Sequence, residues 1–149
     1  MDIVARRAIW LAVLVFALAS CTQLSSPEKQ LSVAVSDAAT ATTTSRLAVS
    51  QLGQGRTSAA VAKTTLTDML TEIDKASASV GAVSVKTSKQ RSLRLRAVAS
   101  IDAAKVAILD AEDSMHDVRG SAPLRRSRQG LGDAAKQLNA LARKLPEPR

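Results

Sequence analysis

Apolar residues recur every three or four positions along most of this chain, a spacing that predicts amphipathic helices. Two seams are especially regular, because aliphatic side chains alternate with alanine in them. The first consists of Ala59, Ala62, Leu66, Met69, Ile73, Ala76 and Val80. The second consists of Ala97, Ile101, Ala104, Ile108, Ala111, Met115 and Val118. A helix with one apolar stripe has to bury it, so the seams predict a core made by packing helix on helix.

Start and stop residues divide the chain after residue 26 into four expected helices. Ser26 before Pro27 is typical of a helix start, and Thr87 with Gln90 has the pattern of a capping box. The expected ends are marked by Gly53, Gly55, Gly81, Gly120 and Pro146. The helices are expected at about 27–52, 57–80, 88–119 and 123–145. We therefore predict an all-α fold, a small antiparallel bundle of three to four helices; separate or partly disordered helices are the alternative.

Two places interrupt the helical pattern. Residues 37–45 are rich in threonine, which is a poorer helix former than alanine. This stretch is either a helix or a tether that lifts the bundle off a surface. Gly130-Leu131-Gly132 predicts either a bend or the true start of a shorter last helix, with Asp133 in its first turn.

The chain opens with a short basic stretch containing Arg6 and Arg7, and an apolar run follows over residues 8–17. The run is too short to cross a bilayer as a helix and has the length of a signal-peptide core. It leads into Leu18-Ala19-Ser20-Cys21, which is an aliphatic residue, two small residues and the only cysteine of the chain. This segment resembles the lipobox of bacterial lipoproteins.

The resemblance implies that residues 1–20 are a cleaved signal peptide and that Cys21 carries the lipid. Residues 21–26 would be a short tether, residues 27–149 would form the bundle, and the membrane would be a partner through the lipid. The protein would be extracytoplasmic: on the outer membrane in a two-membrane bacterium, because Thr22 is not Asp, or on the outer face of a single membrane. The pair Arg6-Arg7 leaves both the general and the twin-arginine export routes open. The residues around it match the twin-arginine motif poorly, which favours the general route.

The composition disfavours several classes of function. The only Trp and Phe are Trp10 and Phe16, within the expected signal peptide, and the chain has no Tyr. Sites for sugars and for single-stranded nucleic acid usually stack on aromatic rings, so we expect no nucleic-acid partner. The single histidine, His116, and the absence of nucleophile motifs predict that the protein is not an enzyme. We expect no cofactor.

The acidic residues around His116 raise the question of a metal site. Glu112 lies four positions before His116, and Asp113 lies four before Asp117, so each pair shares a helix face. These residues lie away from the apolar seam, and one histidine among carboxylates falls short of a zinc ligand set. We interpret the group as a solvated acidic face and expect no metal.

In the third expected helix, basic residues lie at the start and acidic residues at the end, which is the opposite of what the helix dipole favours. Its start carries Lys89, Arg91, Arg94 and Arg96, and its end carries Asp110, Glu112, Asp113 and Asp117. Each charge placed this way costs about 0.3–1 kcal/mol when exposed. We expect cross-helix pairs to compensate. Asp113 and Asp117 would lie beside the arginines of residues 125–128, and Asp74 or Glu72 would lie opposite Arg94 or Arg96.

The basic residues of the last helix have an alternative interpretation, as a face that binds anions. The chain carries 21 Lys and Arg against 13 Asp and Glu, a net charge of +8. The residues concerned are Arg125, Arg126, Arg128, Lys136, Arg143 and Lys144.

We therefore expect a lipid-anchored protein that acts by contact with proteins, as a scaffold, accessory subunit or modulator at the cell envelope, either with a partner protein or by self-association. The alternative is binding of anionic lipid headgroups or acidic wall polymer through the basic face. A third function that stays open is a sensor that holds an apolar ligand, for which an alanine-rich seam leaves little room.

Overall fold

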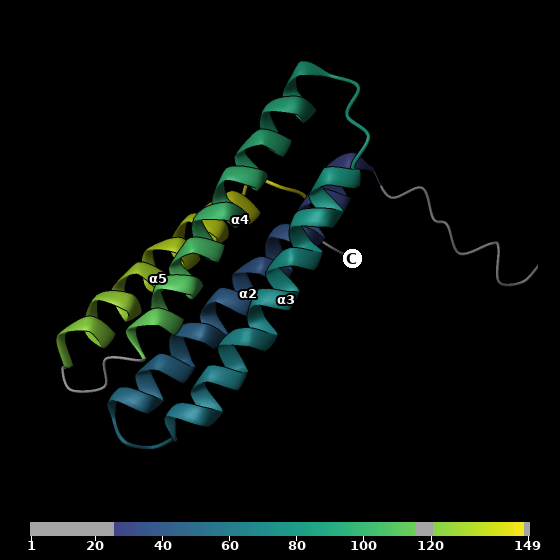
Figure 1. The fold of residues 1–149 in the computed structure, drawn as a ribbon. Coiled ribbons are helices and arrows are strands. Elements are labelled where there is room, and N and C mark those ends of the chain that lie inside the picture. Colours follow the sequence, from purple (N-terminus) through teal and green to yellow (C-terminus); the bar gives the residue numbers. More distant parts are fainter. Residues whose placement is uncertain (1–25, 116–120, 148–149) are drawn as a thin grey trace, which may run out of the picture.

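The computed structural model describes residues 26–115 and 121–147, which form four helices and no strand. The helices are α2 (Pro27–Gly53), α3 (Ala59–Ala82), α4 (Ser88–Ser114) and α5 (Ser121–Ala142). Consecutive helices run in opposite directions along one axis, as Figure 1 shows. The predicted all-α antiparallel bundle is confirmed, and it has four helices.

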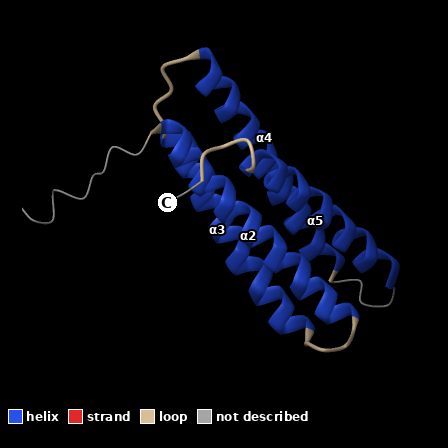
Figure 2. Cartoon of the chain, turned by 180° about the vertical axis from the view of Figure 1, so that it is seen from behind, coloured by secondary structure: helices blue, strands red, loops and turns tan. Residues whose placement is uncertain are grey.

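The helices are arranged in the order α2, α3, α4, α5 around the bundle, and α5 packs against α2 (Figure 2). Helices α2 and α4 also touch across the centre. Small side chains permit this close approach, because Ala97, Ala104 and Ala111 are fully buried on α4 between larger residues. The described core contains only Ala, Val, Leu, Ile and Met among its apolar residues.

The threonine-rich stretch at residues 37–45 is helix, in the middle of α2. Its two seam positions, Thr42 and Ser45, are fully buried in the bundle. The Thr42 hydroxyl donates to the Ala38 carbonyl at 2.7 Å, and the Ser45 hydroxyl donates to the Ala41 carbonyl at 2.9 Å. Because each hydroxyl has a carbonyl acceptor within its own helix, these two side chains are buried without a polar partner on another helix.

The ends of α2 and α3 lie near the predicted positions, but one predicted cap is wrong. Helix α2 ends at Gly53, and Gly55 follows with a φ of 67°, a left-handed conformation that suits glycine. Helix α3 starts two residues later than predicted, after its cap Ser58. Gly81 is not the cap at the other end: it lies inside α3, and the cap is Val83.

Helix α4 begins at the predicted capping box, where Thr87 and Gln90 exchange hydrogen bonds with backbone amides. The predicted end at residue 119 is wrong, because α4 ends at Ser114, where a tighter turn joins the Met115 amide to the Glu112 carbonyl. Acids near a helix C-terminus oppose its dipole, which favours this early end. Val118 and Gly120 lie outside the described residues.

Helix α5 is continuous through Gly130 and Gly132, so the predicted late start of the last helix is wrong. Its end at Ala142 comes before the predicted 145. Turn hydrogen bonds continue from there to Leu145, which is buried directly before Pro146.

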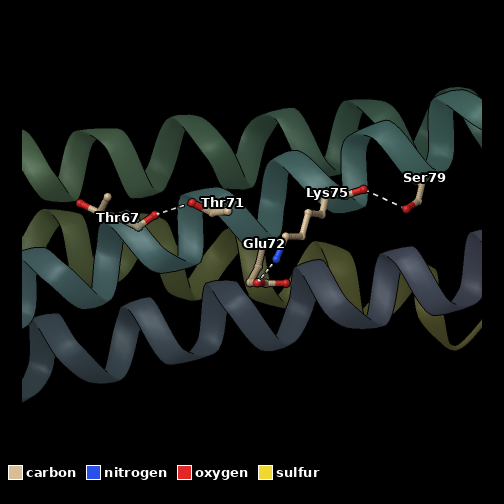
Figure 3. A network of polar contacts seen from close by, with 5 residues as sticks. All are labelled: Thr67, Thr71, Glu72, Lys75 and Ser79. Atoms are coloured by element: carbon tan, nitrogen blue, oxygen red, sulfur yellow. Dashed lines mark hydrogen bonds and ion pairs between the residues drawn. The ribbon is translucent and has the colours of Figure 1, made fainter.

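The outer face of α3 is polar, as Figure 3 shows. Glu72 accepts a 2.7 Å hydrogen bond from Lys75 of the same helix, and the Ser79 hydroxyl donates to the Lys75 carbonyl. The predicted pairing of Glu72 or Asp74 with Arg94 or Arg96 is wrong. Asp74 instead binds Lys105 at 2.6 Å.

The reason for this difference is the register of α4 against α3. The first turns of α4 extend past the ends of the other helices (Figure 1), so a residue farther along α4 lies opposite Asp74. A second cross-helix pair, Lys63 with Glu112 at 3.9 Å, joins the same two helices. Within the described residues no helix is both long and apolar enough to cross a membrane.

The predicted pairing of Asp113 with the arginines of α5 is also not found, because the four ion pairs among the described residues do not include Asp113. Its neighbour in that prediction, Asp117, lies outside the described residues. The short end of α4 leaves Asp113 exposed in its last turn.

Candidate anion-binding groove

A groove of about 540 Å³ lies between α2 and α5 and is lined mainly by cations. Three of the predicted basic residues of α5 line the groove near the start of that helix, and a fourth lines the groove farther along the helix. Helix α2 contributes one more cation. These lining cations are Arg46, Arg125, Arg126, Arg128 and Lys136. All five are exposed, so their charges can meet a ligand from solvent.

Arg46 was not predicted, and it forms the α2 side of the groove. Its guanidinium lies over the backbone of Gly132: a Cβ built on that glycine would be 3.5 Å from the Arg46 Nε atom. Gly132 is buried in the contact between α2 and α5. At this distance the arginine would be in ordinary van der Waals contact with a Cβ at position 132, and its charge lies beside the α5 cations.

The negative charge in the groove is small. Asp133 lines it and binds Lys136 at 3.1 Å within the same helix, a pair that is exposed on both sides. Such a pair is weak because water screens it. Arg126 also lines a shallower groove between α4 and α5, together with Asp110. The α2–α5 groove therefore holds a large excess of positive charge.

A second open groove of about 720 Å³ continues along the same two helices. Lys136 lines both grooves, and the second also contains Ser32 and Ser36 of α2 and Arg143 beyond α5. Arg143 donates from Nε to the Asn139 carbonyl. Lys144 is exposed but lines neither of these two grooves.

Together the two grooves follow one stripe of α5. Six of the lining positions step by alternating four and three residues, the spacing of one helix face. They are Arg125, Gln129, Gly132, Lys136, Asn139 and Arg143. At 1.5 Å per residue this stripe is about 27 Å long. The arrangement is suited to an extended anion that contacts cations at several points.

The remaining predicted site residues are the possible metal ligands and the lipidation residue. No three residues of His, Cys, Asp or Glu lie together as a possible metal site within residues 26–115 and 121–147. Glu112 is engaged with Lys63, whereas His116 and Asp117 fall outside that range. The predicted lipidation residue, Cys21, also lies outside the described residues.

Comparisons of the chain with family models, with curated proteins and with solved structures gave no match.

Proposed function

We propose that this protein is a lipid-anchored, extracytoplasmic and non-catalytic bundle that binds a linear anionic polymer of the cell envelope. The observation that carries the proposal is the gathering of Arg46 with the α5 cations in one groove. The residues Leu18 to Cys21 support the anchor through their resemblance to a lipobox. The anchor would keep the groove in the compartment where acidic wall polymers occur.

The shape of the groove favours a polymer chain over a lipid surface. A bilayer presents a broad plane, whereas the two grooves run lengthwise between two helices, with Arg125, Lys136 and Arg143 along one stripe of α5. Several exposed cations that each contact one anionic group give binding that depends strongly on salt. The groove contains no aromatic side chain, so we expect charge and spacing to determine what binds, with little selectivity for sugar or base.

Reversing charge on both sides of the groove tests this function. We expect the double substitution Arg46→Glu with Arg128→Glu to weaken binding of long-chain inorganic polyphosphate at least about tenfold at low salt. The slope of log affinity against log salt concentration should fall by about two, one for each cation lost. Titration calorimetry of the full chain at several salt concentrations measures both quantities.

The matched control is Lys89→Glu with Arg91→Glu, which changes the net charge equally but lies at the start of α4, outside the groove. The control should retain most of the affinity. Equal loss in both variants would show that only net charge matters and would contradict a groove site. Absence of binding by the unmodified protein at low salt, or binding only to anionic vesicles, would also contradict it.

A second candidate function is contact with another protein, including a second copy. Helix α4 favours this candidate, because Val106 and Leu109 lie one turn apart and are 56% and 42% exposed. Under this candidate the full chain in mild detergent should self-associate at micromolar concentration, and Leu109→Lys should shift it to the monomer. Sedimentation velocity measures the change. A chain that is monomeric throughout and is not crosslinked to any protein in cells would contradict the candidate.

A further inference from the structure

The start of α4 carries four cations, more positive charge than the nearby Glu28, whose charge interacts with that of Lys89, can neutralise. Lys89, Arg91 and Arg96 are exposed, and within the described part of the chain none forms an ion pair or a side-chain hydrogen bond. Arg94 donates to the Val83 carbonyl at 3.2 Å, which leaves its charge unpaired. Positive charge at a helix N-terminus is unfavourable, and the predicted acidic partner, Asp74, binds Lys105 instead.

This charged segment lies at the end of the bundle where the chain arrives from Cys21. Helix α2 begins at Pro27, six residues after Cys21. The Gln90 side-chain amide of α4 donates to the Glu28 carboxylate of α2 at 2.9 Å, which joins the two helix starts. This hydrogen bond is the main cause that lowers the pKa of Glu28, and the charge of Lys89 also lowers it.

The same segment also projects and carries an exposed apolar side chain. We name residues 88–96 the α4 tip, and the start of this segment extends past the ends of the other helices (Figures 1 and 2). Its base contacts the bundle through Leu93. Leu95 is 62% exposed on this tip. At helical spacing, Lys89 and Arg96 are seven residues apart and share one face of the tip. Arg91 lies on the opposite side, beside Leu95 four residues later.

We infer that the α4 tip contacts the anionic headgroups of the membrane in which the acyl chains on Cys21 insert. This inference rests on the lipid anchor of the proposed function. Each Lys or Arg close to an anionic surface strengthens association about fivefold. Leu95 would enter the interface between headgroups and acyl chains, as leucines on membrane-surface helices do.

The contact would also orient the polymer groove. The arginines at residues 125–128 lie near the start of α5, at the opposite end of the bundle from the α4 tip (Figure 1). The 27 residues of α4 span about 40 Å at 1.5 Å each. A bundle held by its α4 tip therefore presents the most cationic part of the groove away from the membrane, where a polymer reaches it.

A label at position 95 tests the contact. Because Cys21 is the only cysteine and lipidation consumes its thiol, Leu95→Cys supplies a single reactive thiol in the full lipidated chain. A nitroxide there should collide with a lipid-bound nickel chelate several-fold more often in phosphatidylglycerol vesicles than in phosphatidylcholine vesicles. A label at Val106→Cys, 11 residues farther along α4, should show no such difference. The difference at position 95 should shrink at 1 M salt, where charges are screened within about 3 Å.

Two charge-reversal variants test whether the tip cations, and not the basic surface in general, cause the difference in collision rate at position 95. Lys89→Glu with Arg91→Glu should abolish the difference at position 95, and these acids suit a helix start, so folding should persist. The equally charged Arg46→Glu with Arg128→Glu should retain it. Equal collision rates in both lipids, or loss of the difference in both variants, would overturn the inference and leave the anchor standing. A protein without acyl mass would overturn both the inference and the anchor.

Discussion

Substituting Ile108 by alanine lowers the free energy of unfolding by about 2–5 kcal/mol, the range for truncating a large buried aliphatic side chain. Ile108 is fully buried in the core, and its seam neighbours on α4, Ala104 and Ala111, are small and also fully buried. They cannot fill the space that the missing side chain leaves. Because small domains are stable by only about 5–15 kcal/mol, the variant loses a large part of its stability. Urea titration followed by far-ultraviolet circular dichroism measures the change.

Val106→Ala is the matched control for this experiment. It also replaces a β-branched residue of α4 by alanine, but Val106 is 56% exposed. We expect its stability to change by less than about 0.5 kcal/mol, because little area is lost and alanine is the better helix former. If the two variants lost the same stability, Ile108 would not lie in a packed core, and the bundle would be wrong at this layer.

Replacing Cys21 by alanine removes the proposed membrane anchor. We expect this variant either to keep its first 20 residues uncleaved or to be released in soluble form, because alanine has no thiol to accept a lipid. Each buried methylene contributes about 0.8 kcal/mol, and two or three acyl chains together hold a protein stably on a membrane. Cell fractionation combined with the intact mass of the purified protein measures the outcome.

Ser20→Ala is the control, since it keeps a small residue before the cysteine and should leave processing and membrane location unchanged. The native protein should begin at Cys21 and carry the mass of its acyl chains. A native protein that retains Met1 and has no fatty-acid mass would contradict the anchor. So would a cleaved Cys21→Ala variant that stays in the membrane fraction.

The bundle could be predicted because its determinants are local. The alternating residues Ile101, Ala104 and Ile108 imply one buried stripe, and all three are fully buried. Thr87 and Gln90 identify the start of α4 from four residues of sequence. The ends of the helices were predicted less accurately than their buried stripes. Gly81 was predicted as a cap but lies inside α3, because glycine permits a cap conformation without requiring one.

The candidate site could be predicted only in part. The basic residues of α5 were recognised from their density, and Arg125, Arg126, Arg128 and Lys136 line one groove. Arg46 was missed because it is far away in the sequence and has no basic neighbours on α2. Its place in the groove depends on which helix packs against α5. No local pattern carries that information.

The sequence by itself determined the helices, their buried stripes and an excess of positive charge, because these follow from spacing, capping and composition over a few turns. Only the tertiary structure decided which charges meet. The register of α4 against α3 brings Lys105, not Arg94, to Asp74 and leaves the α4 tip projecting. Exposed ion pairs contribute about 0–1 kcal/mol, whereas burying apolar stripes contributes far more, so packing sets the register and the charges follow it.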